Sequence, residues 1–299
     1  NCAWVFDLIP MEVSIVADIG SMQLEFPFYC FVQTIGPSLM GEMPAKKFKG
    51  YFPVRFNYDD TFHASGNMSI QVHPDKQAAM ALGDGFTGKD ELWVILDCEE
   101  DSEIFYGFNG YYEKNAIRDA AINGSIVDML NRIKVKKGDC IFIPSGTIHA
   151  LGKGVLAYEL QEASDLTYRL YDWDRTENGK KRELHIEKAL CSIKKCIRII
   201  NVYAASYMDC RLVCLGEYEH FGAIFAALKD EESIMQRCDE TKIISIVSGK
   251  GFLCYKNIKT TVEKGDTIVV PEDPSGFVSI ISSGGLKYIE SRLITRLCP

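Results

Sequence analysis

The 299-residue sequence lacks an apolar run long enough to span a bilayer, and its formal net charge of −8 leaves no excess of positive charge. This charge argues against general affinity for nucleic acid or an anionic membrane, so we expect neither partner. Acidic residues are mixed into the apolar ones throughout residues 1–28, so we expect no signal peptide or membrane helix there. Because the sequence begins with Asn1 rather than Met, we expect a fragment or a processed start.

A compact cysteine framework is also missing, although the sequence has eleven cysteines. The closest pairs, Cys191 with Cys196 and Cys210 with Cys214, do not have zinc-knuckle spacing. Cytosolic proteins rarely keep disulfides, so we expect reduced, mostly buried thiols and a cytoplasmic location.

Most of the chain is predicted to form short strands, because segments rich in Val, Ile and aromatic residues alternate with Gly, Pro and Asp. The clearest candidates are residues 68–72, 92–97, 140–143, 156–160, 243–247, 251–255 and 267–270. Helical spacing of apolar residues in 112–132, broken once by Asn123-Gly124, predicts two short helices. A third helix is predicted at 186–195.

Residues 135–144 and 262–271 share one pattern, Val-x-Lys-Gly-Asp followed by apolar residues and Pro. A turn that feeds a buried strand ending at Pro explains this pattern, and its repetition predicts two similar β-modules with a boundary near 200–214. Two unrelated hairpins with common turn chemistry would give the same pattern. Only the first copy is followed by a histidine, His149, so the first module is the candidate for metal binding.

Four side chains form a candidate metal set. Gln71 and His73 lie two residues apart at the end of a predicted strand, so both point to one face. Glu91 opens the next strand, and His149 closes the turn after Pro144. Two imidazoles, a carboxylate and an amide oxygen would leave a zinc site with a charge of about +1, which keeps the ion an effective Lewis acid. A single histidine at a strand end is more often an ordinary core or surface residue, so the prediction depends on the set.

Four motifs carry a resemblance to a known family. They are residues 69–75 (Ser-Ile-Gln-Val-His-Pro-Asp), 88–91 (Gly-Lys-Asp-Glu), 144–151 (Pro-Ser-Gly-Thr-Ile-His-Ala-Leu) and 164–175. In this order they resemble type I mannose-6-phosphate isomerases (phosphomannose isomerases) of the short bacterial form, in the cupin superfamily. The resemblance is strong over about 46–190 and weaker from 216 to the end. Residues 1–45 depart from the family pattern, because its Trp-Gly-Gly and Gly-Glu-x-Trp motifs are missing.

The resemblance implies a mainly β fold of two cupin-type (jelly-roll) β-barrels with a small helical insertion. It implies that residues 1–200 form a metal-binding catalytic cupin barrel, with the helical insertion at about 112–133. Residues 201–299 would form a second, metal-free cupin-like barrel.

The resemblance also implies a set of site residues and one Zn²⁺ per chain. The implied zinc ligands are Gln71, His73, Glu91 and His149. Arg169 matches the active-site arginine of the family. The positions implied near the phosphate of a small sugar-phosphate substrate are Ser69, Lys89 and Arg175, which agrees with the need for a local basic cluster in an acidic protein.

The implied reaction interconverts mannose 6-phosphate and fructose 6-phosphate through an enediol(ate), which requires a base. Glu159 and Asp165 are the candidate carboxylates, although Glu159 could instead orient a ligand histidine, Asp165 could orient Arg169, and a base from elsewhere stays open. Another sugar-phosphate isomerase on the same scaffold, or a non-catalytic sugar- or metal-binding cupin, also stays open. So does the choice between monomer and homo-oligomer. Asp59-Asp60 is predicted to be a solvated acidic turn.

Overall fold

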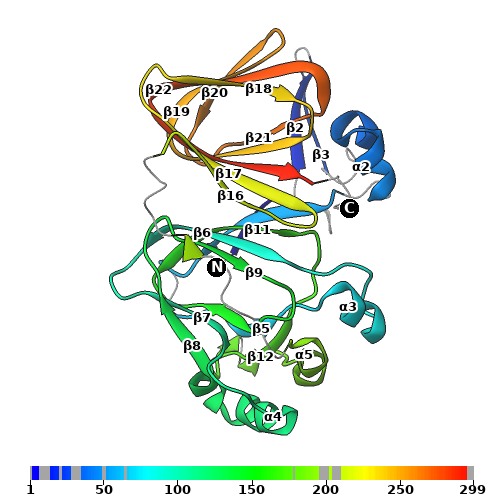
Figure 1. Ribbon diagram of the computed structural model, residues 1–299, viewed down its shortest axis with the longest axis vertical. Coiled ribbons are helices and arrows are strands. Elements are labelled where there is room, and N and C mark those ends of the chain that lie inside the picture. Colours follow the sequence, from blue (N-terminus) through cyan, green and yellow to red (C-terminus); the bar gives the residue numbers. More distant parts are fainter. Residues whose placement is uncertain are drawn as a thin grey trace. The chain divides into compact units, whose positions relative to one another are not determined.

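The computed structural model describes residues 2–6, 14–19, 22–27, 35–48, 52–63, 66–177, 179–194, 202–203 and 210–294. Strands hold far more of these residues than helices do, so the predicted mainly β fold is confirmed (Figure 1). Contacts between residues divide the chain into two compact units. The first is Asn1–Val5 with Phe56–Ala205, and the second is Phe6–Arg55 with Ser206–Pro299.

The first unit contains two main sheets. In spatial order, the strands of the six-stranded sheet are β1 (Cys2–Phe6), β4 (Val54–Asp60), β11 (Val155–Glu162), β6 (Glu91–Cys98), β9 (Cys140–Ile143) and β15 (Val202–Tyr203). Those of the five-stranded sheet are β12 (Tyr168–Tyr171), β5 (Ile70–Val72), β10 (His149–Leu151), β7 (Glu103–Phe108) and β8 (Leu130–Lys134). Trp93, Ile141 and Ala157 of the first sheet share one buried cluster with Tyr106 and Leu151 of the second, so the two sheets enclose a common core.

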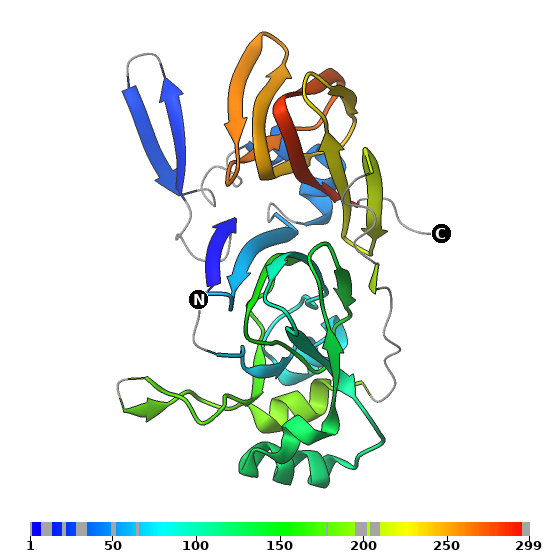
Figure 2. The ribbon, with the colours of Figure 1, turned by 90° about the vertical axis from the view of Figure 1, so that its left-hand side faces the viewer.

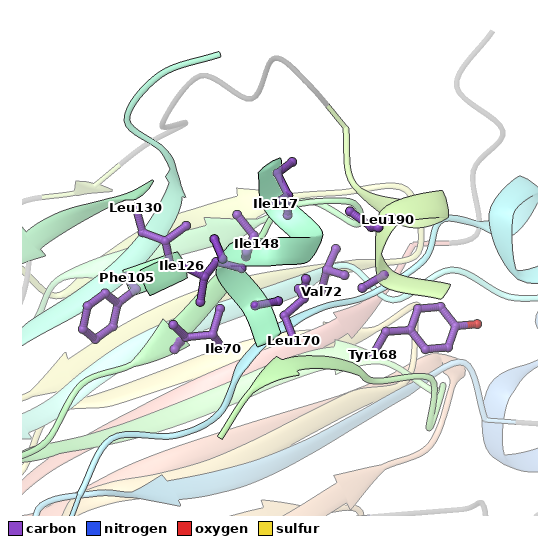
Figure 3. Packing of buried hydrophobic residues seen from close by; sticks show 14 residues of the cluster. Ile70, Val72, Phe105, Ile117, Ile126, Leu130, Ile148, Tyr168, Leu170 and Leu190 are labelled. Atoms are coloured by element: carbon purple, nitrogen blue, oxygen red, sulfur yellow. The ribbon is translucent and has the colours of Figure 1, made fainter. Parts of the chain in front are cut away.

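Helices cover the outer face of the five-stranded sheet. They are α3 (Lys76–Leu82), α4 (Lys114–Asn123), the 3-10 helix η1 (Ser125–Met129) and α5 (Ile186–Ser192). Figure 3 shows Ile117 of α4 packed over Ile70, Val72 and Leu170 from the strands, and all four belong to one buried cluster. Side chains on a strand alternate between its two faces. Since the apolar residues of these strands face the helices, the polar residues between them face the core between the two sheets.

The predicted helical insertion is confirmed but shorter, since residues 114–129 are helical and Leu130–Lys134 forms strand β8. The predicted third helix begins at Ile186 and ends at Ser192, and residue 195 lies outside the described residues. No helix in the described ranges is long and apolar enough to cross a membrane.

The second unit contains a seven-stranded sheet and a separate hairpin. The sheet strands are β16 (Leu212–Glu217), β17 (Phe221–Leu228), β22 (Asp273–Leu293), β19 (Lys242–Tyr255), β20 (Ile258–Glu263), β18 (Ser233–Cys238) and β21 (Thr267–Val270). The hairpin strands are β2 (Ser14–Ile19) and β3 (Met22–Pro27), and the short helix α2 (Glu42–Lys47) belongs to the same unit. Ile244, Val270, Ile280 and Tyr288 are among the side chains of its buried core.

The sequence repeat corresponds to a repeat of hydrogen bonds. In the first copy Asp139 accepts through its carboxylate from the amide three residues earlier at 2.9 Å, and Asp266 does the same at 2.8 Å. Gly138 and Gly265 both have left-handed backbone angles, with φ of 91° and 100°, which glycine adopts without steric cost. The strands that follow, β9 and β21, begin one residue after the aspartate in both units.

The contacts group residues 6–55 differently from the predicted division at 200/201. Leu39 O accepts hydrogen bonds from Thr241 Oγ1 at 2.7 Å and from Glu272 N at 3.1 Å, and Phe48 packs edge-on against His220. These long-range contacts attach residues 35–48 to the second unit, although the prediction assigned them to the first barrel.

Candidate metal centre

Three buried side chains converge between the two sheets of the first unit. Donor atoms of His73, Glu91 and His149 all lie within 4.8 Å of one another, and each residue is at most 1% exposed. His73 Nε2 lies 3.0 Å from Glu91 Oε1, and His149 Nε2 lies 3.4 Å from Glu91 Oε2. The arrangement is that of three ligands around one ion.

Local structure explains why segments distant in the sequence meet here. His73 follows the last residue of β5, and its carbonyl accepts from Gly146 N of the turn before His149 at 2.7 Å. Asp90, next to Glu91, accepts from Ser145 N of the same turn at 2.7 Å through Oδ1. The 144–147 turn is therefore fixed to the segments that carry His73 and Glu91. Asp90 was not predicted, because its role is visible only once the turn folds back onto it.

Both imidazoles are oriented by hydrogen bonds at the nitrogen that points away from Glu91. His73 Nδ1 donates to Leu166 O at 2.9 Å, and His149 Nδ1 donates to Thr147 O at 2.9 Å. A proton on Nδ1 leaves the lone pair on Nε2, so both histidines present a basic nitrogen toward Glu91.

The charges at the centre fit a bound cation. Burial lowers the pKa of His73 to about 4, which keeps its imidazole neutral near pH 7. Burial would raise the pKa of Glu91, but its contacts with His73 and Lys89 hold that pKa well below its usual range. Among the described residues, His73 Nε2 and Glu91 Oε2 have no hydrogen-bond partner. His73 Nε2 faces the other carboxylate oxygen of Glu91, Oε1, at 3.0 Å, so buried acceptors meet with no proton between them. A divalent cation would satisfy both, and the set of nitrogen and oxygen donors suits zinc.

Gln71, the fourth predicted ligand, lies next to the other three. Its Cα pairs with that of His149 across β5 and β10, and its Nε2 lies 3.4 Å from His149 Nε2. Turning the amide by 180° would bring Oε1 to this position, where it could serve as an oxygen ligand. Ser69 Oγ donates to Gln71 Oε1 at 3.2 Å, so the buried Ser69 contacts this amide.

Arg169 belongs to the same row of side chains. It lies directly opposite Gln71 on β12, and residues opposite each other on antiparallel strands point to the same face. Its guanidinium Nη1 donates to Glu183 O at 3.0 Å, and its amide donates to His185 Nδ1 at 3.3 Å. Burial and the nearby charge of Arg182 lower the pKa of Arg169.

Two of the predicted phosphate contacts are engaged within the protein. Lys89 is buried, with Nζ 2.8 Å from Glu91 Oε1, so its charge acts on the candidate ligand. Arg175 donates to Asn67 O at 2.8 Å through Nη1, and its other nitrogens contact Asp172. Both side chains therefore have a partner already.

The two predicted base candidates differ in their surroundings. Glu159 lies on β11 and is 4% exposed, whereas Asp165 is exposed in the loop before β12. Glu159 Oε2 accepts from Trp93 Nε1 at 2.8 Å, and the edge of the Trp93 ring packs against His149, with ring centroids 5.5 Å apart. Burial, followed by the charges of Asp59 and Glu91, raises the pKa of Glu159 well above its ordinary value.

Asp59 is a correction to the sequence interpretation. The predicted solvated turn Asp59-Asp60 lies in strand β4, and Asp59 is 1% exposed. Asp59 Oδ1 accepts from Asn57 Nδ2 at 2.9 Å, and Asn57 Oδ1 accepts from Gln161 Nε2 at 2.7 Å. The alternation of side chains in β4 could have predicted this burial, because Asn57 and Asp59 lie on the same face of the strand, and that face is buried.

The fold and the site describe a mainly β protein of two units, with a candidate metal centre in the first unit.

No family model matches the chain. The chain is 35% identical over 219 residues to the mannose-6-phosphate isomerase ManA of Bacillus subtilis, which covers 70% of this chain and 66% of that protein. It is 32% identical over 207 residues to the mannose-6-phosphate isomerase of Streptococcus mutans, covering 68% and 64%. The chain thus spans slightly less than two thirds of these relatives in the aligned region.

The similarity in structure extends further along the chain. The crystal structure of the mannose 6-phosphate isomerase from Bacillus subtilis matches with a TM-score of 0.77 and 29% identity. That match covers 96% of this chain and 88% of the other. The chain belongs to the mannose-6-phosphate isomerase family.

Proposed function

We propose that the chain is a zinc-dependent aldose–ketose isomerase that interconverts mannose 6-phosphate and fructose 6-phosphate through an enediol(ate). The observation that carries the proposal is the buried meeting of His73, Glu91 and His149, with both histidines held in the tautomer a metal requires. The family membership supports the substrate.

Four side chains of the centre would hold one zinc ion. His73 and His149 would bind through Nε2, Glu91 through its carboxylate and Gln71 through its amide oxygen. When bound, the ion would supply Lewis-acid stabilisation of the negative charge that develops on the sugar oxygens. Lys89 would partly neutralise the negative charge of Glu91. The Glu91 carboxylate would then cancel less of the positive charge of the bound ion.

Arg169 would stabilise the enediolate as a second fixed positive charge. Its position opposite Gln71, on the inward face, supports this role, because a charge fixed before the reaction needs no reorganisation as the enediolate forms. Ser69, Lys89 and Arg175 stay candidates for the phosphate end of the sugar. For Lys89 and Arg175, binding would require an exchange of their present partners, Glu91 and Asp172.

Glu159 is the better placed of the two candidate bases. A buried carboxyl whose pKa is raised can take a proton from carbon near neutral pH more readily than an exposed one. The exposed Asp165 remains a candidate for orienting Arg169, four residues later in the chain.

The function is tested by product formation from mannose 6-phosphate. Turnover should fall to the background level after treatment with a chelator and return when Zn²⁺ is added. Glucose 6-phosphate, assayed in parallel, separates the proposed substrate from an epimer. Metal binding without turnover of either sugar would favour a binding protein, and turnover that survives metal removal would contradict the zinc mechanism.

A cytoplasmic location agrees with the chemistry of the thiols. Cys98, Cys238 and Cys254 form no disulfide, as expected in a reducing compartment. The partner we propose is a small sugar phosphate, and the net charge of −8 disfavours nucleic acid.

A further inference from the structure

Three arginines approach one buried carboxylate at the segment that joins β12 to α5. Asp172 is 5% exposed, and its Oδ1 accepts from Arg175 Nη2 and lies 3.8 Å from Arg182 Nη1. Arg169 is near enough for the charges of Arg182, Asp172 and Arg175 to act on it. The group carries three positive charges and one negative charge, although the protein as a whole is acidic.

Arg175 uses its guanidinium to hold the backbone. Its Nη1 donates to Asn67 O at 2.8 Å and its Nε donates to Asp172 O at 3.2 Å, while Nη2 bonds to the Asp172 carboxylate. Trp173 Nε1 adds a bond to Met68 O at 2.7 Å. Arg175 therefore fixes the 172–175 turn to residues 67–68, and each of its nitrogens has a partner.

Arg182, unlike Arg175, has no hydrogen bond among the described residues to fix its guanidinium. Its contact with Asp172, at 3.8 Å, is too long for a hydrogen bond, and its side chain is 46% exposed. It follows β14 (Lys180–Lys181), which with β13 (Thr176–Glu177) forms the hairpin that extends from the first unit in Figure 2. Within the described ranges, its guanidinium makes no hydrogen bond and its donors are open to a ligand.

The backbone brings Arg182 beside Arg169. Arg169 Nη1 donates to the carbonyl of Glu183, the residue after Arg182, and Arg169 O accepts from His185 N at 2.7 Å. Arg169 Nε is buried and has no partner among the residues that the structure describes. Two neighbouring guanidiniums with unused donors repel each other, and an anion between them would remove the repulsion.

We propose that Arg182 is a substrate-binding residue whose guanidinium clamps the phosphate group of the sugar phosphate, while the neighbouring Arg169 faces the enediolate of the same substrate. The forked donors of arginine match phosphate oxygens in geometry and charge. Asp172 holds Arg182 loosely before the phosphate binds. The assignment rests on the proposed function for the identity of the sugar, but phosphate recognition itself can be measured separately.

Arg182→Gln tests the clamp, with Lys181→Gln as the matched control. Lys181 is the preceding residue and also carries one positive charge, but its Nζ pairs with Asp174 at 2.5 Å. Loss of a charge-assisted contact should raise the KM for mannose 6-phosphate at least about tenfold in Arg182→Gln. Zinc content should not change, and the KM of Lys181→Gln should stay within about twofold of the wild type. Arg182→Lys, which keeps the charge but loses the fork, should give an intermediate KM.

Inorganic phosphate provides a readout that does not depend on turnover. It should raise the Tm of the wild type and of Lys181→Gln, and raise that of Arg182→Gln by much less. An equal response of all three proteins, or an unchanged KM in Arg182→Gln, would overturn the clamp. Equal losses in Arg182→Gln and Lys181→Gln would also overturn it, because they would show attraction by net charge alone. A wild type that responds to phosphate but does not turn over mannose 6-phosphate would refute the proposed function and leave the clamp standing.

Discussion

Arg169 and Gln71 lie directly opposite each other on strands β12 and β5, and their side chains point to the same inward face. Gln71 in turn lies opposite His149 on β10. One row across the sheet thus joins the proposed catalytic arginine, the proposed amide ligand and one of the candidate histidine ligands. Metal binding and catalysis should therefore be separable by single substitutions within this row.

The first prediction separates ligand from catalytic residue. His149→Ala removes one of the proposed ligands, so turnover should vanish. Its zinc affinity should fall by more than about 100-fold, the upper end for mutation of residues that only hydrogen-bond to a ligand. Arg169→Gln should retain zinc and lose turnover by a factor of about 10² to 10³. Zinc content per chain and initial rates, measured on the same preparations, check both. Equal zinc loss in the two variants would show that Arg169 supports the metal rather than the reaction.

The second prediction concerns pH and Glu159. The pKa of Glu159 is raised by burial and by Asp59 and Glu91, so the folded protein binds more protons than the unfolded chain above the ordinary value of 4.5. Stability of the metal-free wild type should therefore contain a term that falls as pH rises from 4.5 through the raised pKa. Glu159→Gln removes this term, so its stability relative to the wild type should increase with pH.

Urea unfolding of both metal-free proteins between pH 4 and pH 8 measures that difference. A stability difference that does not depend on pH would mean that Glu159 titrates alike in the folded and unfolded states.

Trp93 should support the Glu159 carboxyl. Trp93→Phe removes the indole donor at 2.8 Å from Glu159 Oε2 and leaves a buried acceptor unsatisfied, at a cost of about 1–3 kcal/mol. The cost should shrink in the Glu159→Gln background, because a neutral amide oxygen loses less than a carboxyl oxygen when its donor is removed. A double-mutant cycle from urea unfolding measures this coupling, and additive effects would argue against the contact.

Packing under the helices should be sensitive to cavities. Leu170 is fully buried on the outward side of β12, so Leu170→Ala should lower the free energy of unfolding by about 2–5 kcal/mol. Ile122 on α4 is 68% exposed, and Ile122→Ala should stay within about 0.5 kcal/mol of the wild type. Similar losses in both variants would indicate that α4 packs through a different face.

The mainly β fold and the convergence of His73, Glu91 and His149 could be predicted because their signals are local. Strand alternation places Gln71 and His73 on one face, and the repeated Lys-Gly-Asp turn marks the start of β9 and β21 without reference to the rest of the chain.

Other features depend on contacts across the fold and could not be predicted. Asp59 resembles a solvated acidic residue until β4 is known to face a polar interior, where Asn57 donates to it. The grouping of residues 6–55 with the second unit depends on bonds such as Thr241 to Leu39, which span about two hundred positions of the chain and leave no local pattern. Arg182 belongs to no ligand motif, and only the folded segment brings it beside Arg169.

An anomalous-difference map recorded on either side of the zinc absorption edge, from crystals of the zinc-loaded protein, tests the central claim most directly. The account predicts one peak per chain within about 2.0–2.2 Å of Nε2 of His73, Nε2 of His149 and an oxygen of Glu91. A peak elsewhere in the chain, with these three side chains turned away from a common point, would contradict it.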